Sequence, residues 1–180
     1  MRFFLWSLCI LLFFACSQNS NNKDNSKQDL ANKIAAYEDS LYNQDNFAYL
    51  NDVMVERAIE HYVSYAEKYP EEELSPEYLF KAANLYRYKR KFFEALQVYT
   101  NIQENYPEFD KTPQCLFLQA FIFENELGDL ENARILYESF LEKYPDDPFA
   151  KDAKHCLDNL GKPLDEIIKE FEDSQEEEAI

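Results

Sequence analysis

The polar and apolar positions of this chain recur with a spacing of 37 and then 38 residues. Three segments begin at Ala58, Ala95 and Ala133, and each has a tyrosine four residues later and the proline of a Tyr-Pro pair twelve residues later. Apolar residues three or four positions apart form one stripe on a helix, and proline cannot continue a helix. Each segment is therefore predicted to be a helix that packs through its alanine and ends at Tyr-Pro.

A second helix is predicted before each of the last two segments. Ser75-Pro76 and Thr112-Pro113 have the form of an N-cap residue followed by proline at the first helical position. Asp147-Pro148 opens a further helix in the same way. Only two glycines are present, so tight β-hairpins and phosphate-binding loops are disfavoured. The predicted helices span residues 28–43, 47–69, 76–88, 92–106, 113–127, 130–144, 148–160 and 164–172. Gly161 is expected to end the seventh of these as its C-terminal cap.

These recurring positions resemble the tetratricopeptide repeat, whose pattern has a small residue and an aromatic in the first helix, then alanine, an aromatic and proline in the second. The first complete unit has Ala83, Tyr86, Ala95, Tyr99 and Pro107, and the next has Ala120, Phe123, Ala133, Tyr137 and Pro145. Leu79 and Leu116 stand where the family has tryptophan. The resemblance covers about residues 47–160. It implies an all-α solenoid of helical hairpins, with about three repeats and a capping helix, within a domain at 28–172.

The N-terminal segment 1–15 has the form of an export signal. Its apolar run is about 12 residues, whereas a membrane-spanning helix needs about 20. Ala15-Cys16 resembles the end of a bacterial lipoprotein signal, in which the cysteine is acylated, although Phe13 and Phe14 depart from that pattern. We therefore expect lipidation at Cys16 and a flexible tether at 16–27, with an uncleaved anchor or ordinary secretion as the alternatives.

The net charge of −17 disfavours binding to nucleic acid. Residues 173–180 are expected to form a disordered acidic tail. A basic cluster interrupts the acidic sequence at Arg87, Lys89, Arg90 and Lys91. Cations are favoured at a helix C-terminus by the helix dipole, which explains the cluster structurally, and the alternative is a docking point for an acidic partner or lipid phosphates.

No residue pattern indicates catalysis, a metal site or a cofactor. The only histidines, His61 and His155, lie in different units, and zinc sites need three or four grouped ligands. Cys115 and Cys156 are expected to be buried free thiols. We therefore expect a protein that is not an enzyme.

The resemblance implies a concave groove lined by the first helix of each repeat. Aromatic anchors among polar groups are typical of binding surfaces. The alternative for Phe117 and Phe121 is that they pack on a neighbouring helix. The candidate groove residues are Phe80, Asn84, Arg87, Tyr88, Phe117, Phe121 and Glu124.

Signal and repeats together resemble bacterial envelope lipoproteins of the tetratricopeptide type, some of which assist β-barrel assembly or coordinate cell-wall synthesis with the Tol–Pal system. This resemblance implies a protein-binding scaffold on the periplasmic face of the outer membrane, with other envelope proteins as partners. The second hypothesis is a membrane-anchored accessory subunit that binds a secreted peptide or glycan.

Overall fold

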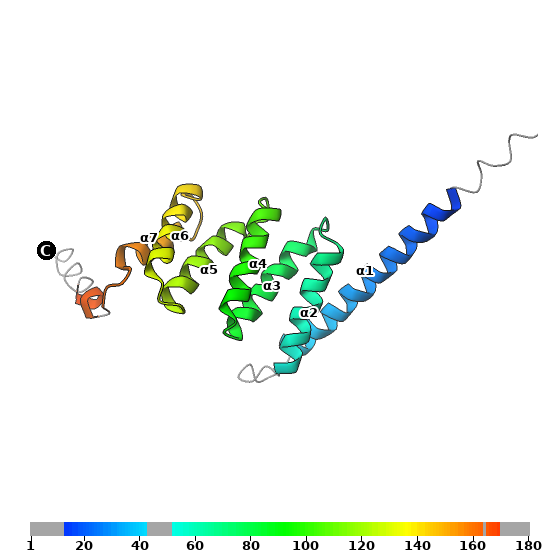
Figure 1. Cartoon of the computed structure of the whole chain (residues 1–180), viewed down its shortest axis with the longest axis horizontal. Helices are drawn as coiled ribbons and strands as arrows, with labels where there is room; N and C mark the ends of the chain where they lie inside the picture. The colour runs from blue at the N-terminus through cyan, green and yellow to red at the C-terminus, as the bar shows by residue number, and fades with distance from the viewer. Residues whose placement is uncertain (1–12, 43–51, 164, 170–180) are drawn as a thin grey trace, which may run out of the picture. The chain divides into compact units, whose positions relative to one another are not determined.

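The computed structural model describes residues 13–42, 52–163 and 165–169 (Figure 1). Regular structure in these ranges is helical, without β-strands, which confirms the all-α prediction. Helices α3 to α7 begin and end within two residues of the predicted positions. Residues 165–169 are helical as well. The helices are α1 (Phe13–Tyr42), α2 (Asp52–Lys68), α3 (Leu74–Tyr88), α4 (Phe92–Asn105), α5 (Thr112–Asn125), α6 (Leu130–Lys143) and α7 (Ala150–Asn159).

Helix α1 is longer than predicted. Residues 16–27, expected to be a flexible tether, belong to this helix of 30 residues. The segment contains no glycine or proline, so no residue in it stops a helix that continues into the packed part of α1. Residues 1–12 of the predicted signal and the acidic tail at 173–180 lie outside the described residues. No helix among the described residues has both the length and the apolar character needed to cross a membrane.

The chain divides into two compact units at Leu85 and Tyr86, within α3. In the first unit α1 packs on α2, and Ile34 of α1 is buried. Glu38 of α1 connects three helices, because its Oε1 accepts a hydrogen bond from the Tyr62 hydroxyl of α2 at 2.9 Å and one from Lys81 Nζ of α3 at 2.7 Å. The tyrosine of the first repeated segment is therefore held by a carboxylate on another helix.

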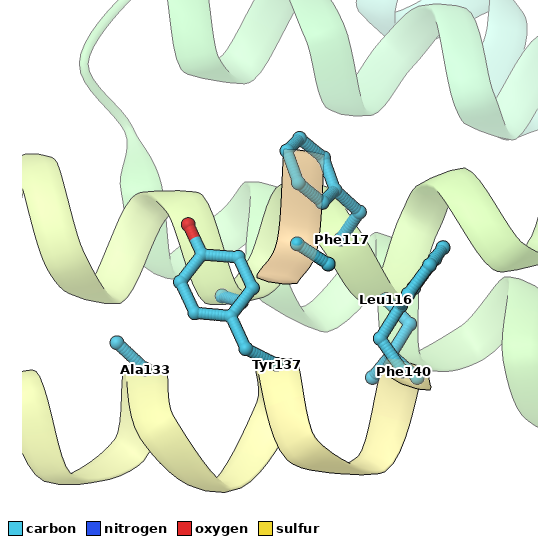
Figure 2. Close-up of a cluster of buried hydrophobic side chains, with 7 residues drawn as sticks. Leu116, Phe117, Ala133, Tyr137 and Phe140 are labelled. Atoms are coloured by element: carbon cyan, nitrogen blue, oxygen red, sulfur yellow. The ribbon is translucent and has the colours of Figure 1, made fainter. Parts of the chain in front are cut away.

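In the second unit consecutive helices are neighbours: α4 packs on α5, α5 on α6, and α6 on α7. Helix α5 is buried on more than one side because it lies between α4 and α6. Ala133, Tyr137 and Phe140 form the inward stripe of α6, and they face Leu116 and Phe117 of α5 (Figure 2). The predicted alanine and tyrosine stripe is therefore the packing face of this helix.

Each Tyr-Pro pair forms the same corner between helices. In the first corner the Glu72 amide donates to the Tyr69 carbonyl at 3.0 Å, and the Ser75 amide donates to the Glu72 carbonyl at 2.9 Å. The same two bonds recur at the corners that begin with Tyr106 and Tyr144. Proline stops the helix and these paired turns redirect the chain, so the 37–38-residue repeat is a repeat of corners.

Ser75 and Thr112 differ from the predicted N-caps. Both lie inside the first turn of their helices, and their side chains donate rather than accept: Ser75 Oγ to the Tyr69 carbonyl at 2.6 Å, and Thr112 Oγ1 to the Tyr106 carbonyl at 2.8 Å. Both residues are buried, so each hydroxyl supplies a hydrogen bond to a tyrosine carbonyl just after the end of the preceding helix, where the helix itself offers no donor. The third corner has Ala150 at this place and lacks the bond.

The turns and the C-terminal cap rely on left-handed backbone. Gly161 follows α7 with φ +79°, which confirms its predicted role as a C-terminal cap. Gly128, between α5 and α6, has φ +67°, and Arg90, between α3 and α4, has φ 57°. The predicted capping helix after α7 has its apolar face at Leu164, Ile167, Ile168 and Phe171. Ile167 is half-buried and Ile168 is 48% exposed, and the other two residues lie outside the described residues.

Candidate binding surface

Arg87 lies at the centre of the candidate surface in the second unit. Its guanidinium lies over the Phe121 ring, 5.9 Å from the ring centroid, and it hydrogen-bonds to Tyr99. Burial raises the pKa of the Tyr99 hydroxyl, and the neighbouring guanidinium offsets part of that rise. A cation over an aromatic face is attracted by the ring, so Arg87 and Phe121 fix each other's orientation.

Glu124 occupies the position 37 residues after Arg87, with the opposite charge. Its Oε2 accepts a hydrogen bond from the Tyr137 hydroxyl at 2.7 Å. Burial and then this bond raise the pKa of Tyr137, and the hydroxyl also interacts with Cys156 of α7. The repeated tyrosines of α4 and α6 thus each hold one charged group, Arg87 or Glu124, on the preceding helix.

Phe117 is a core residue, which decides between its two sequence-based interpretations. It is 9% exposed and packs against Phe149, Tyr137 and Phe140, with ring centroids 5.2, 5.8 and 6.0 Å away. The groove interpretation of Phe117 is wrong, because the rings of Tyr137 and Phe140 on α6 and of Phe149, the residue before α7, pack around its side chain. Figure 2 shows Phe117 with the two rings from α6. Phe80 is 9% exposed as well and offers little surface to a ligand.

The remaining candidates are more accessible. Tyr88 is 53% exposed, and Phe121, Arg87 and Glu124 are half-buried. Asn84, in the first unit, is half-buried and donates its Nδ2 to the Phe80 carbonyl at 3.0 Å. Within the second unit, the candidate residues therefore include one exposed aromatic ring, one aromatic ring stacked by a cation, and two fixed groups of opposite charge.

Sequence reasoning missed the role of the tyrosine hydroxyls. The positions of Tyr62, Tyr99 and Tyr137 were predicted as packing residues, and each is buried, but each hydroxyl also bonds to a charged side chain. The sequence feature that could have indicated these bonds is that all three segments have tyrosine rather than phenylalanine at this position. A buried hydroxyl needs a hydrogen-bond partner, so three tyrosines predict three polar partners.

The basic cluster occupies the turn after α3. Arg90 Nη2 lies 3.3 Å from Glu126 Oε2, and its guanidinium lies 5.1 Å from the Phe92 ring centroid. Arg87, Lys89 and Lys91 are half-buried, while the Arg90 side chain is 73% exposed.

Histidine and cysteine occupy unremarkable environments. His61 packs beside Tyr37, with ring centroids 5.0 Å apart, and His155 is exposed. Cys115 and Cys156 are free thiols, the first buried and the second half-buried. Among the described residues, no three His, Cys, Asp or Glu side chains are grouped as metal ligands. The side chain of Cys16 is not among those described.

The fold and this surface define a protein built from helical hairpins that repeat at 37–38 residues. Residues 77–108 and 114–147 match the tetratricopeptide-repeat family, and these segments hold most of α3 with α4, and of α5 with α6. These two matches support tetratricopeptide repeats in α3 to α6, and the predicted fold class, an all-α solenoid of helical hairpins, is confirmed. No curated protein matches it. Repeats of this kind bind other proteins, so the chain has the architecture of an interaction scaffold.

Proposed function

We propose that this protein is an interaction scaffold anchored in the bacterial cell envelope, on the periplasmic face of the outer membrane, where it serves outer-membrane or cell-wall assembly. The observation that carries the binding role is the set of fixed groups in the second unit. Arg87 and Glu124, 37 residues apart, are held by Tyr99 and Tyr137 with Phe121 beside Arg87. Groups held in place before binding lose little conformational entropy when a partner arrives.

The charges suit an extended polypeptide as the ligand. A peptide backbone presents both carbonyl oxygens and amide hydrogens, and its side chains add charge of either sign. Arg87 can donate to carbonyls or carboxylates, and Glu124 can accept from amides or a basic side chain. Tyr88, 53% exposed, adds an aromatic contact of the kind found at the centre of protein interfaces.

The envelope location rests on the resemblance of Met1–Cys16 to a lipoprotein signal. Acylation with several chains would hold the protein stably on a membrane, at about 0.8 kcal/mol per buried methylene. Helix α1 contacts the rest of the first unit from Lys27, whose Nζ bonds to Glu72 at 3.0 Å. The ten helical residues before it, 17–26, would therefore form a spacer of about 15 Å rather than a flexible tether. Mass spectrometry of the mature N-terminus tests this part, and an N-terminus without acylated Cys16 would refute it.

The scaffold role is tested with a photo-crosslinking amino acid placed at Tyr88 in intact cells. The matched control carries it at Ile135, which has the same exposed fraction, 53%, but lies on the face of α6 opposite Ala133 and Tyr137. We expect one or a few envelope proteins to be captured from position 88 and not from position 135. Equal capture from both positions, or from neither, would contradict the proposed surface.

The second candidate is an accessory subunit that binds a secreted peptide or glycan. The exposed ring of Tyr88 favours it, since an aromatic face can stack on a sugar ring. Saturable binding of cell-wall glycan fragments or secreted peptides to the purified protein, lost in Tyr88→Ala and Phe121→Ala, would support this reading. Phe117→Ala is unsuitable as a binding variant because Phe117 lies in the core. Unchanged affinity in both variants would exclude the reading.

A further inference from the structure

The turn between α3 and α4 concentrates positive charge on a strongly acidic protein. Four of the chain's 18 lysines and arginines lie within residues 87–91, against 35 aspartates and glutamates in the whole chain. We call Arg87, Lys89, Arg90 and Lys91 the basic turn. Three of these cations follow directly on the last residue of α3, where the helix dipole favours them. The helix dipole is a structural reason for cations at this position, so a binding role needs a second observation, which Arg90 provides.

Arg90 is kept at a backbone position that suits glycine better. Its φ of 57° is left-handed, a conformation that costs a residue with a side chain about 1–2 kcal/mol. The next hairpin meets the same requirement with Gly128, at φ +67°. A strained residue that is not glycine points to a role for its side chain. The Arg90 side chain is 73% exposed although it contacts Glu126 and Phe92.

The segment that leaves α7 begins at the same end of the second unit. Arg90 contacts Glu126, at the start of the α5–α6 turn. Leu130, at the end of that turn, lies beside Gly161, where a Cβ would meet its Cδ1 at 3.0 Å. The basic turn, the α5–α6 turn and the exit of the chain from α7 are thus linked by two contacts.

Residues 170–180 have the opposite charge to the basic turn. They contain six acids, at 170, 172, 173, 176, 177 and 178, and no lysine or arginine. We propose that this acidic segment docks on the basic turn of its own chain, where it competes with acidic partners for that surface. The contact goes beyond the scaffold role, because it would regulate access to a surface beside Tyr88.

Chain length and tethering make the contact feasible. Three helix-to-helix steps of about 8–10 Å separate α7 from α4, and an extended segment of eleven residues spans about 36 Å. Tethering gives the segment an effective concentration in the millimolar range. An ionic contact with an intrinsic Kd of about 1 mM would therefore be occupied about half of the time.

The test places a photo-crosslinking amino acid at Gln175 in the full chain and maps the crosslinks by mass spectrometry. We expect internal crosslinks to residues near the basic turn. Lys89→Glu with Lys91→Glu should lower their yield about tenfold, and adding Glu176→Lys, Glu177→Lys and Glu178→Lys should restore it. The last three changes alone, which leave the folded units untouched, should also lower the yield.

The matched control is Lys151→Glu with Lys154→Glu, the same charge change on exposed residues of α7 that are nearer in sequence to the segment. It should leave the yield unchanged. An equal loss in the control, or no loss in the Lys89 and Lys91 variant, would overturn the proposal. Mixing isotopically heavy and light copies distinguishes docking within one chain from docking between chains, because crosslinks between heavy and light copies would assign the basic turn to a second copy. In cells, capture of another protein in place of the internal crosslink would assign the basic turn to a partner. Either result would overturn self-docking.

Discussion

The α4–α5 interface and the α5–α6–α7 core both involve α5, but they are held by different chemistry. In the first, buried Gln119 of α5 connects to α4 through three hydrogen bonds: Oε1 accepts from Gln103 Nε2 at 2.6 Å, and Nε2 donates to Thr100 Oγ1 at 2.8 Å and to the Leu96 carbonyl at 3.1 Å. The second is an apolar cluster around Phe117, Tyr137 and Phe140.

The difference separates two tasks of the repeat. The alanines, tyrosines and prolines at matching positions determine where helices end and how closely they approach. The residues between them determine what fills the contact: Gln119 stands 37 residues after Ala82, which is fully buried without any polar group. A satisfied buried amide specifies one alignment of two helices, whereas an aromatic cluster contributes mainly burial.

The largest expected effect on stability comes from a change in the apolar α5–α6–α7 core. Phe117→Ala should lower the free energy of unfolding by about 3–5 kcal/mol, because it removes a buried ring and leaves a cavity. Phe121→Ala, at a half-buried position, should cost less than half as much. Urea unfolding measures both, and equal losses would mean that Phe117 is not the core residue that its packing indicates.

The pH dependence of the free energy of unfolding tests the burial of the Cys115 thiol. Burial raises the pKa of Cys115 from 9.0 to about 12. Because the folded pKa is the higher one, the stabilisation is complete below pH 9 and is lost as the pH rises from 9 to 12. At pH 10.5 the loss is on the order of 2 kcal/mol. Cys115→Ala should therefore show a shallower fall in stability between pH 8.5 and 10.5 than the unmodified chain, and parallel curves would contradict the assignment.

The polar interface should depend on Gln119. Gln119→Ala removes all three hydrogen bonds between this amide and α4, which should cost about 1–3 kcal/mol. The control is Gln114→Ala, a half-buried glutamine on the same helix, which should change stability by about 0.5 kcal/mol or less. If thermal unfolding shows equal shifts, the amide network does not hold this interface.

The hydroxyl that bonds to the tyrosine carbonyl can be removed from the second corner and added to the third. Thr112→Val removes the bond to the Tyr106 carbonyl and should cost about 1 kcal/mol. Ala150→Ser places a hydroxyl at the matching position of the third corner, and we expect a gain of at most about 0.5 kcal/mol. A loss of stability in the serine variant would show that the third corner cannot accept the bond.

The smallest expected effects on stability come from two substitutions in the left-handed turns at Arg90 and Gly128. Gly128→Ala should destabilise by about 1 kcal/mol through its backbone alone, because nothing lies within 4 Å of the new Cβ. Arg90→Gly should relieve the same strain and gain up to about 1 kcal/mol, less what its contacts with Glu126 and Phe92 contribute. Calorimetry that shows the same sign for both would contradict this account.

The candidate surface was only partly predictable. Tyr88 is exposed, and Arg87, Phe121 and Glu124 remain accessible, as the repeat register implied. The sequence left Phe117 open between a groove residue and a packing residue, because a register places a residue on a helix face but does not show which neighbouring side chains enclose it. The enclosing rings come from Phe149, Tyr137 and Phe140, up to 32 residues away in sequence.

By itself, the sequence determined the helices from α3 to α7, the Tyr-Pro ends of α4 and α6, and the cap at Gly161. Proline geometry, left-handed glycine and a helical stripe all act within one or two turns of the chain. Tertiary structure alone decided that α5 is enclosed from two sides, that the Ser75 and Thr112 hydroxyls donate to the corner carbonyls, and that each repeated tyrosine holds a charged group on another helix. Those choices depend on burial, and burial depends on residues that are distant in the chain and meet only after the helices have packed.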